Sequence, residues 1–249
     1  TRMIARLDDP DAPRVGVLST LPGMTAPGGE GGYTLLADIS KSFDLVPISQ
    51  EFQSLPEDLD VLFLAHPPEM SPRQSWLIDQ YILRHGRAVI MVDAAAKTAV
   101  GGGLLDSAND HPRSDLGILG KAWGVTLSED AVADAANALP VPVDTGNGRM
   151  EELAHPLFIG APASDMNRKD LVTADLTRNV NFGAPGALLV GTLPDGAVFS
   201  PLISTGPSPS FIDAAEAVRD MTPGDVLRSY KTSPEPLVMA ARLSGPLIS

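Results

Sequence analysis

Short apolar runs alternate with amphipathic segments through the first hundred residues of the sequence. Three of these runs, Val15–Leu18, Val61–Ala65 and Ala88–Val92, are continuous enough to predict buried strands. Phe43–Ser49 is a further strand candidate, and Tyr33–Ser42 places its larger apolar residues on one face of a helix. Strands and helices that alternate with short connections form right-handed crossovers and pair in parallel. The pattern therefore predicts an α/β fold with a doubly wound, mostly parallel sheet.

The clearest helix in the sequence is marked at both ends. Ser71 is a typical N-cap, Pro72 suits the first helical position, and Gln74 stands three residues after the cap. Gly86 is a typical left-handed stop. We expect a helix between these limits, connecting two parallel strands.

The rest of the chain gives a weaker pattern. Residues 137–170 combine prolines and turn signals with short strand candidates, so we expect an irregular insertion there. Residues 1–13 are expected to form a lead-in segment. No repeat, low-complexity linker or firm boundary divides the sequence, and 249 residues are enough for one large α/β domain. We therefore expect residues 1–249 to form a single domain.

Composition and charge argue against several classes of function. The formal net charge is -13, which repels a nucleic-acid backbone and an anionic membrane surface, so we expect neither as a partner. The sequence has no cysteine, which removes thiol nucleophiles and thiolate metal sites. Its four histidines are scattered, so we expect no metal and no cofactor. His111 and His155 each precede a proline, and we expect both in solvated loops.

A glycine-rich loop between Ser19 and Ser40 connects the first predicted strand to the first predicted helix. Similar loops hold phosphate in P-loop proteins, but no lysine follows the glycines here, and the GxGxxG dinucleotide pattern fails at Thr34. The loop lies at the carboxyl end of a strand, where open α/β sheets bind ligands. Gly31 and Gly32 are therefore candidates for backbone contacts to a polar ligand. The alternative is a plain surface loop.

Three polar residues follow the ends of predicted parallel strands. Ser19, His66 and Asp93 would meet at one edge of the sheet, and together they have the composition of a Ser–His–Asp site. The glycines of a GxSxG elbow are missing around Ser19, and strand ends collect polar residues for other reasons. We therefore predict no catalytic residue. Ser19, His66 and Asp93, with Gly31 and Gly32, remain candidate ligand- or partner-binding residues.

Five segments carry motifs in a fixed order, and the last of them is PEPLVMAARLSG, Pro234–Gly245. Leu55–Asp93 contains LPEDLDVL, a proline turn, MSP, a helix with IDQY, a glycine stop and a strand that ends in aspartate. Asp115–Asp134 contains WGV, Met166–Leu188 contains MNRKDLVTADL, and Ser200–Ile212 contains STGPSPS. This series resembles the gliding-motility-type auxiliary component of an uncharacterised class of ABC transporters. The resemblance leads us to expect serine where this chain has Gly206.

The resemblance implies a fold related to class I glutamine amidotransferases and flavodoxin-like sheets. The amidotransferase nucleophile is a cysteine, which this chain lacks. The resemblance also implies a non-catalytic, extracytoplasmic (periplasmic) domain of a transport subunit, tethered to a bacterial inner membrane by transmembrane helices outside this chain. Both ends of the chain are accordingly expected to be cut from a longer protein.

The partners that the resemblance implies are ABC permease and ATPase subunits encoded separately, with envelope proteins as further candidates. Membrane contact is expected only through helices that this chain does not include. Two alternatives stay open. One is a serine hydrolase-like enzyme, and the other is a small-solute binding module, each using the cleft at the carboxyl ends of the strands.

Overall fold

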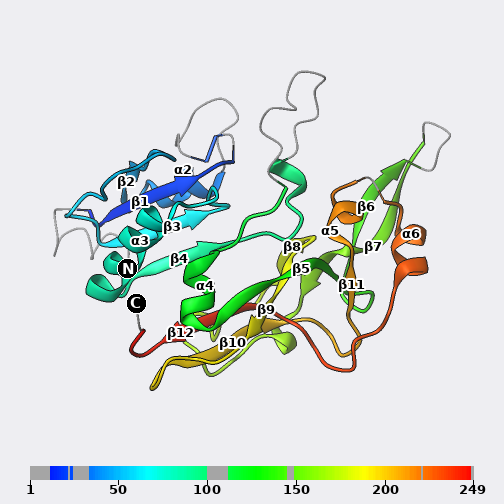
Figure 1. Cartoon of the computed structure of the whole chain (residues 1–249). Helices are drawn as coiled ribbons and strands as arrows, with labels where there is room; N and C mark the ends of the chain where they lie inside the picture. Colours follow the sequence, from blue (N-terminus) through cyan, green and yellow to red (C-terminus); the bar gives the residue numbers. More distant parts are fainter. Residues whose placement is uncertain are drawn as a thin grey trace. The chain divides into compact units, whose positions relative to one another are not determined.

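The computed structural model describes residues 12–21, 23–24, 34–99, 112–144, 149–219 and 221–247, and Figure 1 traces the chain. The chain forms two compact units. The first unit comprises Thr1–Val92, Ser114–Leu119 and Ser249, and the second comprises Asp93–Arg113 and Gly120–Ile248.

A four-stranded parallel sheet forms the centre of the first unit, in the order β2-β1-β3-β4 (Figure 1). Its strands are β1 (Arg14–Ser19), β2 (Asp44–Pro47), β3 (Val61–Ala65) and β4 (Ala88–Met91). Helix α2 (Thr34–Ile39) connects β1 to β2, and α3 (Pro72–His85) connects β3 to β4. The two connections leave the sheet centre in opposite directions, so β1 and β3 flank a topological switch point. The prediction of parallel pairing is confirmed for these strands.

Helix α3 has the ends that its sequence predicts. The Ser71 side chain accepts a hydrogen bond from the Gln74 N–H, and the Gln74 side chain accepts one from the Ser71 N–H. Pro72 begins the helix. At the other end Gly86 adopts a left-handed φ of 66°, and its N–H donates to the Ile82 carbonyl over 2.7 Å. Local capping chemistry therefore sets both limits of this helix.

Three small antiparallel sheets form most of the second unit, and their strand orders are β11-β5-β9, β6-β7-β8 and β10-β12. The strands are β5 (Val125–Ala133), β6 (Ala138–Asp144), β7 (Met150–Ala161), β8 (Val180–Gly183), β9 (Gly186–Val190), β10 (Val198–Ser204), β11 (Ser210–Ile212) and β12 (Val238–Ser244). The expectation of a mostly parallel sheet therefore holds for the first unit alone. The connection between the paired strands β6 and β7, from Asp144 to Met150, is too short for the crossover that parallel neighbours require.

Short helical segments complete the described elements. They are α4 (Ile118–Trp123), α5 (Ala214–Val218), α6 (Pro223–Ser229) and the 3-10 turns η1 (Lys97–Ala99) and η3 (Ala163–Asp165). Within the described ranges, no helix is both long enough and apolar enough to cross a membrane.

Residues 137–170, where the sequence indicates irregular structure, contain the long pairing of β6 with β7. Pro140 lies opposite Ala154 and Pro142 lies opposite Glu152. Among the strands that the structure describes, β6 pairs only with β7, so these prolines lie on an edge strand, where a missing N–H is tolerated. The prolines are therefore compatible with a strand at this place.

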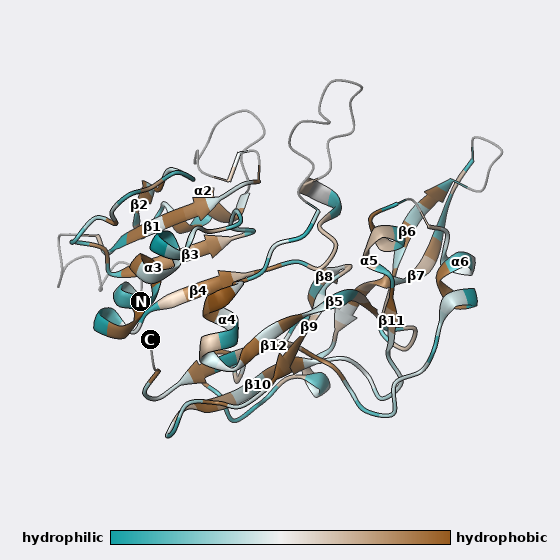
Figure 2. Cartoon of the chain, viewed as in Figure 1, coloured by the Kyte–Doolittle hydropathy of each residue, from teal (hydrophilic) through white to brown (hydrophobic). Residues whose placement is uncertain are grey.

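Apolar residues of each unit gather into cores. Figure 2 shows in brown the hydrophobic stretches of the strands that contribute to them. In the first unit Leu36 of α2 packs on alternate residues of β1 and β3, together with Met24; the strand residues are Val15, Val17, Phe63 and Ala65. Among the described residues of the second unit, one such cluster gathers around Leu157 and Ile212 and another around Val132 and Ile159. Fully burying one such side chain contributes about 1.5–3 kcal/mol.

Candidate functional site

Ser19 lies at the carboxyl end of β1, as the sequence predicts. Its side chain is buried, and its Oγ accepts a hydrogen bond from the Leu21 N–H over 3.0 Å. An open pocket of about 600 Å³ lies beside it, lined by Ser19 and by residues 47–51, which end and follow β2. This pocket, hereafter the Ser19 pocket, occupies the edge of the sheet where open α/β folds hold ligands.

His66 follows β3 and is buried, with only 1% of its surface exposed. Its Nδ1 lies 2.9 Å from the Oγ of Ser114, which is also buried. The His66 N–H donates to the Met91 carbonyl, and the His66 carbonyl accepts from the N–H and Oγ1 of Thr20. The residue thereby joins the ends of β1, β3 and β4.

The backbone of His66 has a φ of 49°, in the left-handed region that residues other than glycine rarely adopt. Such a conformation costs roughly 1–2 kcal/mol and persists where the surroundings hold it. The backbone hydrogen bonds to Met91 and Thr20 provide that support. His66 therefore has an architectural role at the switch point, whatever else it does.

The other predicted site residues are placed differently. Asp93 follows β4, is partly buried and belongs to the second unit. Gly31 and Gly32 lie outside the described residues, as does His111. Of the five candidates, Ser19 and His66 are those that the structure places in the first unit at the ends of neighbouring strands.

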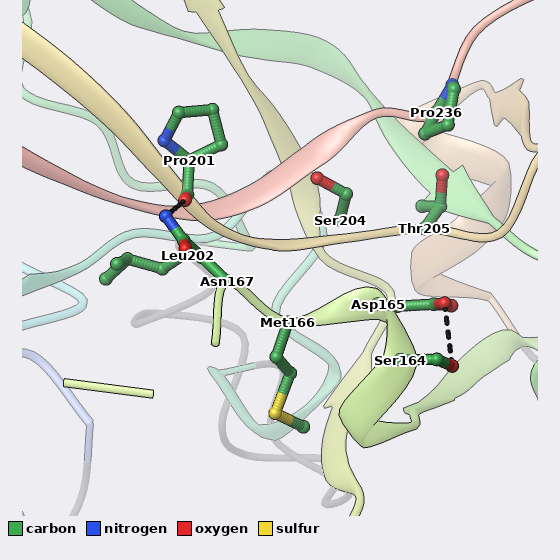
Figure 3. Close-up of a pocket in the computed structure, with 9 residues that line it drawn as sticks. All are labelled: Ser164, Asp165, Met166, Asn167, Pro201, Leu202, Ser204, Thr205 and Pro236. Carbon is green, nitrogen blue, oxygen red and sulfur yellow. Dashed lines mark hydrogen bonds between the residues drawn. The ribbon is translucent and has the colours of Figure 1, made fainter. Parts of the chain in front are cut away.

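A second open pocket, of about 350 Å³, lies in the second unit (Figure 3). It is lined by Ser164, Asp165, Met166, Asn167, Pro201, Leu202, Ser204, Thr205 and Pro236. The Asp165 carboxylate accepts hydrogen bonds from the Ser164 hydroxyl, at 3.1 Å, and from Asn137 Nδ2, at 2.8 Å. Several of these residues belong to the motif segments Met166–Leu188 and Ser200–Ile212, but the sequence gives no sign that they form a pocket, because β10 and the segment after η3 meet only through long-range pairing.

Comparison with protein families identifies the chain. Residues 12–249 match the model of a family described as an ABC-type uncharacterized transport system. The chain belongs to this family. The resemblance to an auxiliary component of an ABC transport system is thereby confirmed. Neither the search of curated proteins nor the search of solved structures found a match.

In this ABC transport auxiliary protein, the glycine that stands in place of the expected serine has a packing reason. The N–H of Gly206 donates to the buried carboxylate of Asp134 over 2.7 Å. A Cβ at this position would lie 3.3 Å from that carboxylate and from Asn137 Nδ2. The same carboxylate accepts from the Ala136 N–H and from Asn137 Nδ2. A serine at position 206 would have to displace part of this network.

His155 of the ABC transport auxiliary protein is not in a solvated loop, so that expectation is wrong. It lies in β7 with 3% of its surface exposed, its Nε2 is 2.9 Å from the Met221 carbonyl, and the Leu157 N–H donates to its Nδ1. These contacts fix the neutral tautomer with the proton on Nε2. Burial lowers the pKa of His155; the hydrogen bond to Met221 opposes that shift, and the charge of Lys97 adds to it.

Metal binding has no support among the residues that the structure describes. No group of three or more histidine, aspartate or glutamate side chains comes close enough there to hold an ion.

Proposed function

We propose that this chain is a non-catalytic domain of an ABC transport auxiliary subunit and acts by contact with other proteins of the transport system or with the transported material. Family membership supports the transport role. The sequence contains no GxxxxGK[ST] motif, and we assign ATP hydrolysis to a separately encoded subunit. The permease is the second expected partner.

The observation that carries the non-catalytic part of the proposal is the engagement of Ser19 and His66 in contacts that hold the first unit together. A serine nucleophile needs an imidazole base within hydrogen-bond reach and an open approach for the substrate. The Ser19 hydroxyl oxygen accepts a hydrogen bond from the Leu21 N–H, and the Nδ1 of His66 lies within hydrogen-bond distance of the Ser114 hydroxyl. His66 is also nearly inaccessible to solvent. These contacts favour a structural role for both residues.

The finer assignment follows from the resemblance to gliding-motility-type auxiliary components. We assign the chain to the periplasmic face of a bacterial inner membrane, in a subunit whose transmembrane helices lie outside this sequence. The strand order β2-β1-β3-β4 supports the flavodoxin-like relation, because flavodoxin-like sheets begin with this order. The relation to amidotransferases is proposed for the architecture alone.

Affinity capture of the full-length protein from its native membranes tests the transport role. We expect an ABC permease and an ABC ATPase to be recovered with it. Recovery of neither subunit, together with measurable ester or amide hydrolysis by the protein, would reject both parts of the proposal.

A fluorophosphonate probe tests the non-catalytic part directly, because it labels activated serines. We expect equal background labelling of the wild type and of Ser19→Ala. Strong labelling that disappears in Ser19→Ala would identify Ser19 as a working nucleophile and favour the hydrolase alternative.

The location is tested with a single introduced thiol, because this sequence has no cysteine of its own. Leu227 lies in α6 and is exposed, so Leu227→Cys offers an accessible label site. A membrane-impermeant maleimide should label it in cells whose outer membrane has been permeabilised, without lysis. Labelling that requires lysis of the inner membrane would place the domain in the cytoplasm.

A further inference from the structure

The segment Asn167–Leu176, hereafter the 167–176 loop, presents apolar side chains to solvent, and the two at its tip are more exposed than Leu176 at its end. Leu171 is 95% exposed and Val172 is 59% exposed. No other large apolar side chain in the described ranges exceeds 59% exposure. A single exposed leucine on a loose loop needs no explanation. Here, however, the loop is held in one conformation by its own contacts.

A buried carboxylate anchors the loop next to its tip. The side chain of Asp170 accepts the Val172 N–H on Oδ1, at 3.0 Å. Its Oδ2 accepts from Nε and Nη2 of Arg242 in β12, at 2.9 Å and 2.7 Å. Charge-assisted hydrogen bonds of this kind are among the strongest in proteins. The tip is therefore tied to a strand of the second unit.

Further hydrogen bonds fix the backbone on both sides of the tip. Asn167 receives the Lys169 N–H on its side chain, and its Nδ2 donates to the Pro201 carbonyl (Figure 3). Buried Thr173 donates from Oγ1 to the Asn167 carbonyl over 2.6 Å. Arg168 Nη1 donates to the carbonyls of Thr173 and Leu176. The loop is thus closed on itself around Leu171 and Val172.

The charge around the tip is opposite to that of the whole chain. Exposed Arg168, Lys169 and Arg178 flank the apolar pair, whereas the formal charge of the chain is -13. Asp170 is paired with Arg242, which leaves Asp175 as the exposed acidic residue of the loop. A surface with this chemistry complements an apolar groove with carboxylates at its rim.

We propose that the 167–176 loop is a preformed docking element whose Leu171–Val172 tip enters an apolar, acid-rimmed groove on a partner protein. The inference rests on the contact-based role proposed above. Because the loop is ordered before it binds, association loses little conformational entropy, which is how small contact surfaces gain affinity. A protein is favoured over an anionic membrane, since the net charge of the chain is repelled by such a surface.

Photo-crosslinking in the full-length protein, expressed in its native membrane, tests the inference. Benzoylphenylalanine replaces Leu171 in one variant and exposed Leu227 of α6 in the control. We expect protein adducts from position 171 at least tenfold above those from position 227, mapped to apolar residues beside aspartate or glutamate. Lys169→Glu should reduce the adduct yield several-fold, and Lys231→Glu, a charge reversal elsewhere in the second unit, should leave it unchanged.

Two results would overturn the inference. One is an adduct yield at position 171 no higher than at position 227. The other is adduct formation with lipid alone, matched by Leu171-dependent binding to phosphatidylglycerol-containing vesicles, which would make the loop a membrane contact. Circular dichroism melting of each variant confirms that the fold is intact.

The crosslinking result is independent of the transporter assignment. Adducts from position 171 with a protein unrelated to ABC transport would support the docking element and reject the proposed function. Capture of the permease and ATPase without such adducts would support the proposed function and reject the docking element.

Discussion

The Nδ1 atom of His66 lies 2.9 Å from the Oγ of Ser114, and both side chains are buried in the first unit. The contact ties the end of β3 to a segment that returns to this unit after the chain has passed into the second. His66 also holds a left-handed backbone conformation at the switch point of the sheet. The type of residue that position 66 accepts is therefore limited both by the contact of the ring with Ser114 and by the positive φ angle.

Replacements of His66 should differ according to their tolerance of a positive φ. Asparagine adopts the left-handed region more readily than other residues with a side chain, whereas β-branched valine strongly disfavours it. We expect His66→Val to lower the free energy of unfolding by about 1–2 kcal/mol more than His66→Asn. Urea denaturation at neutral pH measures both. Equal losses would show that the ring contact, and not the backbone, dominates at this position.

Gly124, in the WGV motif, should tolerate no side chain. Its φ is +73°, and an added Cβ would collide with the carbonyl oxygen of Thr192. The obstacle is backbone, so it cannot rotate away. We expect Gly124→Ala to destabilise the protein by about 2 kcal/mol or more, visible as a lower urea midpoint.

Gly224 provides the matched control for Gly124. It lies in α6, and an added Cβ would meet side-chain atoms no closer than 3.7 Å. Alanine has a higher helix propensity than glycine, so Gly224→Ala should raise stability by up to about 1 kcal/mol. A loss of stability in Gly224→Ala, or none in Gly124→Ala, would contradict this assignment of the two glycines.

The buried His155 should make stability depend on pH in a predictable direction. Its pKa in the fold is lowered, chiefly by burial. As the pH falls past the unfolded-state pKa of about 6.5, the unfolded chain therefore takes up the proton at a higher pH than the folded chain does. Stability is therefore fully present above pH 6.5 and falls as the pH drops through that value towards the lowered one. Between pH 7.5 and 5.5 the wild type should lose more stability than His155→Gln. Parallel pH profiles of the two proteins would contradict the prediction.

Neutralising Asp170 should loosen the 167–176 loop. The pKa of this carboxyl lies below its ordinary value, because the Val172 N–H, and after it Arg242, stabilise the charged form. Asp170→Asn keeps the shape but removes the charge, so amide exchange at Val172 should become roughly tenfold faster. Asp175→Asn, an exposed change in the same loop, should leave that rate unchanged. Unaltered protection of Val172 in Asp170→Asn would show that the remaining contacts suffice.

Local chemistry made the first unit predictable. The caps at Ser71 and Gly86 act within one turn of α3, and the apolar runs of β1, β3 and β4 carry their strand signal in a few adjacent residues. Alternation of strands and helices then leaves little choice but parallel pairing. For β1, β3 and β4, each end of the observed strand lies within one residue of the end of the apolar run.

The second unit was less predictable, because its pairings depend on residues distant in sequence. β5 pairs with β9 on one side and with β11 on the other, and no local pattern specifies these partners. Pro140 and Pro142 indicate a turn or loop unless the strand is known to lie at an edge. The expectation of a mostly parallel sheet therefore does not hold for the strands of the second unit.

The candidate site was predictable in position and not in chemistry. Polar residues at the ends of β1 and β3 were expected at one sheet edge, and Ser19 does line a pocket there. The partners of these residues, however, include Ser114, which reaches the first unit only through the tertiary fold. Nor does the sequence indicate that Leu171 is exposed, because the tripeptide DLV resembles the start of a buried strand.

The prolines of β6 have a consequence for how this protein can associate. Pro140 and Pro142 have no N–H to donate, so the open side of the hairpin is a poor template for an incoming strand. Addition of a foreign β-strand, a common route both to complex formation and to fibrous aggregates, is thereby discouraged at this border. Recognition at this edge of the sheet is therefore left to contacts between side chains.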